Sequence, residues 1–198
     1  MGWGGAQVCA QAGIPTVAVK ATPGSTDKIR AGLEKSLGKM VERQKMTAEH
    51  RDSTLGLLKF TTNEGDVADC DLIIESIIED LDVKKAMFQR LEGIVSPQAM
   101  LTTNTSTLSV TALMAVCKQR DRVAGLHFFN PAPVMKLVEI IHGFETSDQV
   151  ISSLDGFCKK VGKDPVIVQD TTGFIVNRLL TPYMLLSLIH ISAPPRPY

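Results

Sequence analysis

The sequence predicts an α/β protein with a doubly wound parallel sheet, because short apolar runs alternate with longer helical patterns. The short runs are rich in Val, Ile and Leu, as strands buried on both faces of a sheet are. Crossover helices between such strands would make them parallel. The runs expected as strands are Thr16–Val19, Leu72–Glu75, Met100–Thr103, Val123–Leu126 and Pro165–Val168.

The longer segments between these runs are expected to be helices. In one of them, Ala86, Met87 and Leu91 recur at helical spacing and form an apolar stripe beside charged residues. The expected helices are Gly5–Ala12, Asp27–Arg43, Leu81–Ile94, Ser109–Val116 and Ser147–Val161.

A change of pattern near Asp170 predicts a domain boundary. Val138–Ile141 is expected to add a strand before it, so that residues 1–170 form one α/β domain. After it, Gly173 suits a helix start, and Phe174–Leu188 is expected to open a helical domain over residues 171–185. Leu186–Ser192 reads like a translated sequencing adapter, so residues 186–198 are expected to be a non-native tail.

Composition and cysteine spacing argue against several kinds of partner and site. The 198 residues include 21 Lys+Arg and 21 Asp+Glu, which does not favour nucleic acid or a membrane surface as a partner. No apolar run approaches the roughly 20 residues of a membrane span, and no secretion signal precedes the fold. The cysteines are widely spaced and predict neither a disulfide framework nor a metal site: Cys9, Cys70, Cys117 and Cys158. A cytoplasmic protein is expected, or one of the mitochondrial matrix in a eukaryote.

The glycine-rich start is a partial dinucleotide motif. Such a motif has a strand, then GxGxxG, then a helix. Gly2 stands where its last glycine would be, whereas the first strand and the first two glycines are absent. A flexible glycine-rich start is an equal alternative. Lys20 follows the next strand, where an acidic residue usually binds the ribose; it is either a surface lysine or a sign that NADP is tolerated.

Four blocks occur in the order and approximate spacing of one enzyme family. They are Ile74–Lys84 (IESIIEDLDVK), Asn104–Leu108 (NTSTL), Gly125–Glu139 (GLHFFNPAPVMKLVE) and Gly173–Leu180 (GFIVNRLL). Between about Gly2 and about Tyr183 the chain resembles the 3-hydroxyacyl-CoA dehydrogenases. The resemblance implies a Rossmann-type NAD-binding domain that lacks its first strand, followed by the start of a helical substrate and dimerisation domain.

The resemblance also implies site residues. His127 would be the base that takes the proton from the 3-hydroxyl of an acyl-CoA, with Glu139 as its hydrogen-bond partner. Ser106 and Asn177 would position the substrate oxygen. The cofactor would be NAD and the parent protein a homodimer; the residues lining the cofactor would be Gly2, Glu79, Lys84, Ser106 and Asn130.

These roles agree with the chemistry of alcohol oxidation. A cofactor that takes the hydride leaves the protein to supply a base, and histidine titrates near neutrality. An adjacent carboxylate fixes its tautomer and stabilises the imidazolium as it forms. His127 is expected just after a strand's carboxyl end, where ligands of α/β sheets bind.

Other interpretations stay open for the same residues. His127 could be a hydrogen-bonded core histidine, and Ser106 could cap the helix that starts near Ser109. Glu75 and Glu79 could be solvated charges. The cations of the second helix form either a solvated face or contacts to coenzyme A phosphates: Lys28, Arg30, Lys35 and Lys39.

Two other functions compete with this one. A non-catalytic homologue similar to the lambda-crystallins would keep the fold, although His127 with Glu139 favours chemistry. Sugar-acid and hydroxyisobutyrate dehydrogenases use a catalytic lysine, and the HFFNP segment speaks against them. Without a first strand and a complete helical domain, the polypeptide as written is expected to be poorly stable and inactive.

Overall fold

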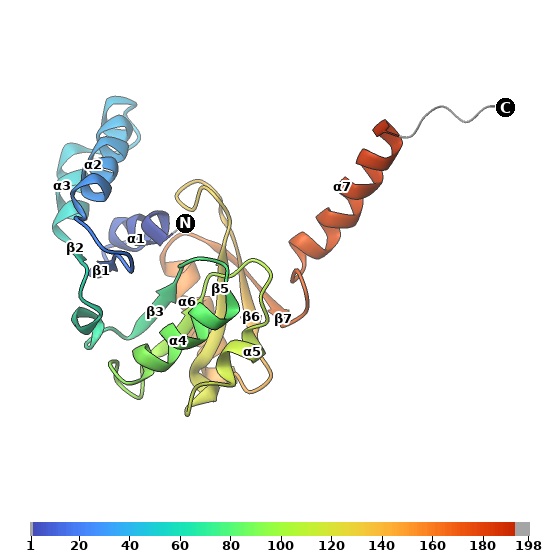
Figure 1. The fold of residues 1–198 in the computed structure, drawn as a ribbon. Coiled ribbons are helices and arrows are strands. Elements are labelled where there is room, and N and C mark those ends of the chain that lie inside the picture. The colour runs from blue at the N-terminus through green and yellow to red at the C-terminus, as the bar shows by residue number, and fades with distance from the viewer. Residues whose placement is uncertain (1, 193–198) are drawn as a thin grey trace.

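The central element is a five-stranded sheet, seen in a computed structural model that describes residues 2–192 (Figure 1). Its strand order is β3-β4-β5-β6-β7. β3 to β5 are parallel, as predicted, but β6 is antiparallel to β5 and parallel to β7, so the sheet departs from the parallel arrangement at one pair of neighbours. The bounds are β3 Leu72–Glu75, β4 Met100–Thr103, β5 Val123–Phe128, β6 Leu137–His142 and β7 Asp164–Gln169.

A separate two-stranded parallel sheet joins β1 (Thr16–Val19) to β2 (Leu58–Thr61). Among the described residues no ladder links it to the larger sheet. β2 and helix α3 (Ala48–Gly56) were not predicted, because α3 buries only Thr54 and so shows no apolar stripe in the sequence.

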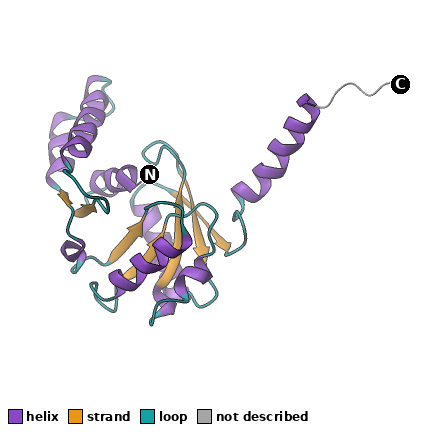
Figure 2. Ribbon diagram, in the orientation of Figure 1, coloured by secondary structure: helices purple, strands orange, loops and turns teal. Residues whose placement is uncertain are grey.

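Helices pack on both faces of the sheet (Figure 2). One buried cluster contains Val8 of the first helix, Leu126 and Leu154; a second, on the opposite face, contains Phe88 and Leu101. Side chains of Asp80, Ser109 and Ser147 cap the fourth, fifth and sixth helices. The other helices are α1 Gly2–Gln11, α2 Asp27–Glu42, α4 Leu81–Glu92, α5 Val110–Met114, α6 Asp148–Lys160 and α7 Val176–Ser192, with short 3-10 turns at Glu64–Val67 and Arg120–Arg122.

Helix α7 extends away from the rest of the molecule (Figure 1). It starts two residues later than predicted and continues to Ser192, past the expected junction at residue 186. Many of its large apolar side chains are exposed, including Leu179 and Tyr183. Residues 193–198 of the predicted tail lie outside the described residues. None of the helices in the described part of the chain is long and apolar enough to cross a membrane.

Candidate active site

A histidine–carboxylate pair lies across the β5–β6 hairpin. The ladder pairs His127 directly with Glu139, and His127 Nδ1 lies 2.8 Å from Glu139 Oε2. Only 4% of His127 and 1% of Glu139 is exposed. The expectation that His127 follows the strand is wrong, because β5 continues to Phe128. Its place within the ladder fixes the histidine more firmly than a loop would.

Ser106 lies on the other side of the imidazole. Its Oγ is 3.1 Å from His127 Nε2, so the ring links a hydroxyl to a carboxylate. Ser109, not Ser106, caps α5, by accepting a hydrogen bond from the Ala112 amide. Asn104 also joins the loop after β4 to β5, because its Oδ1 accepts a 2.7 Å hydrogen bond from the Phe128 amide. Asn104 lies in the NTSTL block but was not predicted as a site residue.

Aromatic side chains flank the imidazole. The ring centroids of Phe129 and Phe174 lie 4.6 and 5.7 Å from that of His127. Phe128 points to the other face of the sheet and packs in the core. The imidazole is therefore flanked by Phe129 and Phe174 and not by Phe128.

The loop before α7 is tied to the same carboxylate. Glu139 Oε1 accepts hydrogen bonds of 3.0 Å from the amides of Ile175 and Val176. Phe174 reaches this arrangement with φ of +52°, a left-handed conformation that is unusual for a bulky residue. Glu139 thus uses one oxygen for His127 and the other for the start of α7.

Asn177 is brought to the site by this helix start. Its Nδ2 donates a 3.1 Å hydrogen bond to the backbone oxygen of Ser106. Asp170 makes a second link between the same two segments, since it accepts from Ser109 Oγ at 2.8 Å and from the Thr111 amide at 2.7 Å. Ser106 and Asn177, 71 residues apart, therefore lie side by side.

Glu79 anchors the loop that contains Ser106 through hydrogen bonds. Its Oε1 accepts from the Thr105 hydroxyl and, at 2.9 Å, from the Ser106 amide. Burial alone would raise the pKa of Glu79, but these hydrogen bonds and the charge of Lys84 outweigh it and lower the pKa. The ionised carboxylate thus stabilises the loop that carries Ser106.

Lys84 lies next to Glu79 and is 1% exposed. Its Nζ is 2.7 Å from Glu75 Oε1 and 3.6 Å from Glu79 Oε2. The interpretation of Glu75 as a solvated charge is wrong. Glu75 is 5% exposed, and it also accepts a hydrogen bond from Thr103 Oγ1 at 2.8 Å. In this arrangement Lys84 contacts carboxylates rather than an open surface.

Gly2, at the start of α1, lies close to the strand ends. A Cβ at Gly2 would come within 3.3 Å of the Cβ of Ser76, and one at Gly4 within 3.2 Å of that of Ala132. The helix N-terminus thus packs closely against the loops after β3 and β5. Asn130, in the second of these loops, is exposed at the same end of the sheet.

The lysine after β1 is bound by its own loop. Lys20 Nζ donates hydrogen bonds to the backbone oxygens of Thr22 at 2.9 Å and Pro23 at 2.5 Å. This favours the surface-lysine interpretation of Lys20. A pocket of about 500 Å³ lies next to it, lined by Pro23, Gly24, Ser25, Thr26, Phe60, Thr61 and Thr62.

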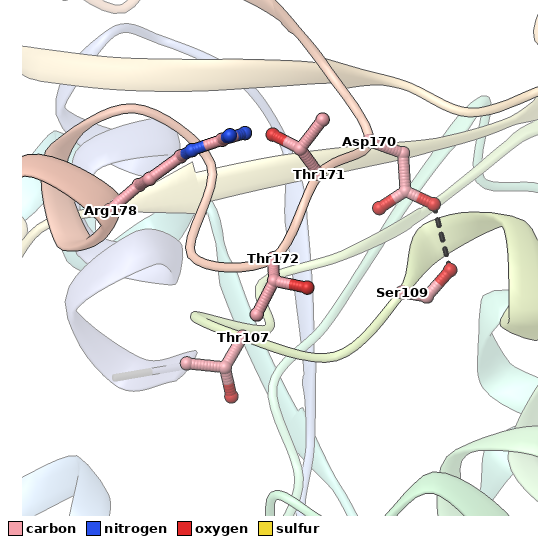
Figure 3. Close-up of a pocket in the computed structure, with 6 residues that line it drawn as sticks. All are labelled: Thr107, Ser109, Asp170, Thr171, Thr172 and Arg178. Carbon is pink, nitrogen blue, oxygen red and sulfur yellow. Dashed lines mark hydrogen bonds between the residues drawn. The ribbon is translucent and has the colours of Figure 1, made fainter.

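A pocket of about 540 Å³ lies between the Thr107–Ser109 segment and the segment that runs from Asp170 to Arg178 (Figure 3). Arg178 extends toward Thr171, while Asp170 bonds Ser109 on the other side. The pocket is lined by Thr107, Ser109, Asp170, Thr171, Thr172 and Arg178.

Within residues 2–192, no group of three or more His, Cys, Asp or Glu side chains could hold a metal ion.

A doubly wound sheet is the fold of many dinucleotide-binding domains, and a histidine held by a carboxylate is a common acid–base group. The family model for the NAD binding domain of 3-hydroxyacyl-CoA dehydrogenase matches residues 1–171. The chain therefore belongs to the 3-hydroxyacyl-CoA dehydrogenase family.

Individual relatives agree with this assignment. The chain is 40% identical over 184 residues to the probable 3-hydroxybutyryl-CoA dehydrogenase of Deinococcus radiodurans, covering 93% of this chain and 66% of the relative. It is 42% identical to the mitochondrial hydroxyacyl-coenzyme A dehydrogenase of Rattus norvegicus, covering 93% of this chain and 61% of the relative. The crystal structure of 3-hydroxybutyryl-CoA dehydrogenase from Escherichia coli K12 superposes with a TM-score of 0.93 at 42% identity, covering 96% of this chain and 40% of that one. The chain thus spans about two-thirds or less of the length of these relatives.

Proposed function

We propose that this chain is the catalytic NAD-binding part of an enzyme that oxidises (S)-3-hydroxyacyl-CoA to 3-oxoacyl-CoA. The observation that carries the proposal is the chain of contacts Glu139–His127–Ser106, with separations of 2.8 and 3.1 Å. A buried histidine held between a carboxylate and a hydroxyl is suited to moving one proton at a time.

In this mechanism His127 Nε2 accepts the proton from the substrate 3-hydroxyl. Glu139 accepts the hydrogen bond from Nδ1–H, so that Nε2 carries the free lone pair and the imidazolium is stabilised when it forms. Ser106 Oγ, beside Nε2, orients the substrate oxygen. Asn177 positions the Ser106 backbone and lies where it can contact the same oxygen. In the reverse direction the imidazolium returns the proton.

The residues at the N-terminus of α1 fit a dinucleotide. The first amides of a helix have no acceptor within that helix, and an added Cβ at Gly2 or Gly4 would come within 3.2–3.3 Å of its neighbours, so glycine favours the close packing seen here. NAD would supply the hydride acceptor. We propose that Gly2, Glu79, Ser106 and Asn130 line its site, with Lys84 acting through Glu79.

The proposal is tested with the chain carrying the flanking sequence of its gene, here called the extended protein. Purified extended protein is mixed with acetoacetyl-CoA and either NADH or NADPH, and absorbance at the reduced nicotinamide band is followed. We expect NADH-dependent reduction; NADPH should serve less well, because Lys20 is bound by its own loop. Cofactor binding without turnover of any 3-oxoacyl-CoA would instead favour the non-catalytic homologue.

We also propose a homodimer that forms through a helical domain continuing from α7. The proposal is supported by the exposed apolar side chains of α7, because large exposed apolar patches mark surfaces that another part of a protein covers. Light scattering of the extended protein tests the dimer. The compartment we propose is the cytoplasm, or the mitochondrial matrix if the source is a eukaryote.

A further inference from the structure

Lys163 is a buried lysine that the proposed chemistry does not use. It follows the C-terminus of α6 and directly precedes β7, and it is 6% exposed. Gly162, with φ of +72°, turns the chain there, and the Lys163 amide bonds the oxygen of Cys158. The backbone of this residue is therefore fixed on the helix side of the sheet.

The ammonium of Lys163 is aimed at a loop, not at a carboxylate. Its Nζ donates to the backbone oxygen of Ala132 at 2.6 Å and to that of Met135 at 2.8 Å. Burial lowers the pKa of Lys163, and the nearby Asp164 only partly offsets this. Burying an ammonium is costly unless it is hydrogen-bonded, and the two carbonyl oxygens of this loop supply those bonds.

The loop it holds, residues 130–136, connects the two strands that carry His127 and Glu139. The loop is a turn closed on itself, with the amides of Val134 and Met135 both bonded to the oxygen of Pro131. On its other side, Ala132 packs against Gly4 of α1 at the cofactor end of the sheet. The loop is thus held on one side by hydrogen bonds from Lys163 and packs on the other side against the N-terminus of α1.

We propose that Lys163 is a positioning residue for the cofactor, which sets the 130–136 loop, and with it Asn130, against the N-terminus of α1. The inference rests on the proposed function for its cofactor but not for its chemistry. It assigns Lys163 an effect on the binding of NADH and little effect on proton transfer, because neither Nζ contact reaches His127 or Ser106.

The test replaces Lys163 by Met, which keeps the length and removes the donor, and by Gln, which is too short to bond both oxygens. Lys159→Met is the matched control, since Lys159 lies on α6 and pairs with Asp155 at 2.6 Å in a mostly exposed position. Fluorescence titration of the extended protein gives Kd for NADH. Lys163→Met and Lys163→Gln should raise it about fivefold to tenfold, roughly the effect of one lost hydrogen bond, while Lys159→Met leaves it unchanged.

Two further readouts separate positioning from plain stabilisation. Hydrogen exchange on the 198-residue chain should show the Val134 and Met135 amides exchanging about tenfold faster in the variants, with the amides of β5 unchanged. The KM for NADH should rise while kcat changes less than about twofold. If Lys163→Met does not fold, Lys163→Gln decides by the same criteria.

The inference is overturned if the folded variants bind NADH as tightly as the wild type, or if kcat falls while Kd for NADH stays constant. Failure of the proposed function would look different. Turnover of 3-oxoacyl-CoA would then be missing in the wild type itself, while the effect of Lys163 on NADH binding and loop exchange would still be measurable.

Discussion

His127 and Glu139 face each other across one antiparallel ladder position, with Nδ1 and Oε2 2.8 Å apart. The same carboxylate binds the first amides of α7 through its other oxygen. One side chain therefore orients the imidazole of His127 and also fixes the helix that brings Asn177 beside Ser106. A change at Glu139 should affect both.

Replacing His127 by Gln should lower the kcat of the extended protein about 10²–10⁴-fold, the usual contribution of a general base. The amide has no titratable nitrogen to take the proton. NADH binding should stay nearly intact, because no cofactor contact is assigned to His127. Steady-state kinetics and NADH titration measure the two effects, with His50→Gln on the exposed surface of α3 as the control. Full activity of the His127 variant would show that the base is another group.

Replacing Glu139 by Gln should lower kcat about a hundredfold or more and also destabilise the fold. An amide has one acceptor oxygen, whereas Glu139 uses two, so its NH2 group would confront either His127 Nδ1–H or the amides of Ile175 and Val176. Activity assays and thermal unfolding measure these effects. Glu145→Gln, which loses only an exposed pair with Arg120, is the control and should change neither. A variant with normal kcat and lowered Tm would assign Glu139 a structural role alone.

A linear sequence pattern encodes some features of this fold and not others. The strands of the five-stranded sheet are visible as buried apolar runs, but a run of Val and Ile looks the same beside a parallel and an antiparallel neighbour. The reversed direction of β6 was therefore missed. The motif blocks led to His127, Glu139, Ser106 and Asn177, which the structure brings together.

Other members of the site could not be found from local pattern. From the sequence alone Glu75 could be a solvated charge, yet it forms a buried pair with Lys84, nine residues later, because β3 and α4 converge. Asp170 and Lys163 act on backbone groups of distant loops, and a backbone partner leaves no mark in the sequence. Tertiary contacts decide these roles, so they require coordinates.

Replacing Glu79 by Gln should lower stability at neutral pH and leave it nearly unchanged in acid. Because the pKa of Glu79 is lowered in the fold, its stabilising effect is present above the unfolded pKa of about 4.3 and is lost as the pH falls through the folded value. Thermal unfolding of wild type and variant from pH 7 down to pH 3 measures the difference, with each lost kcal/mol lowering Tm by about 2–4 °C. A constant difference across this range would mean that the charge of Glu79 does not stabilise the Ser106 loop.

Replacing Gly125 by Ala should destabilise the β5–β6 hairpin. A Cβ there would lie 2.7 Å from the Cβ of Ile141 and 2.9 Å from Val110 Cγ2, closer than packed carbon atoms approach, and both neighbours are fully buried. Overpacking of this kind costs about 1–3 kcal/mol. The strand carries His127 two positions later, so kcat should fall as well. Gly156→Ala, where a Cβ on α6 meets nothing within 4 Å, is the matched control and should raise stability by about 0.5–1 kcal/mol. Urea unfolding of the two variants compares them directly, and equal stabilities would show that the hairpin yields to the added methyl group by moving Ile141.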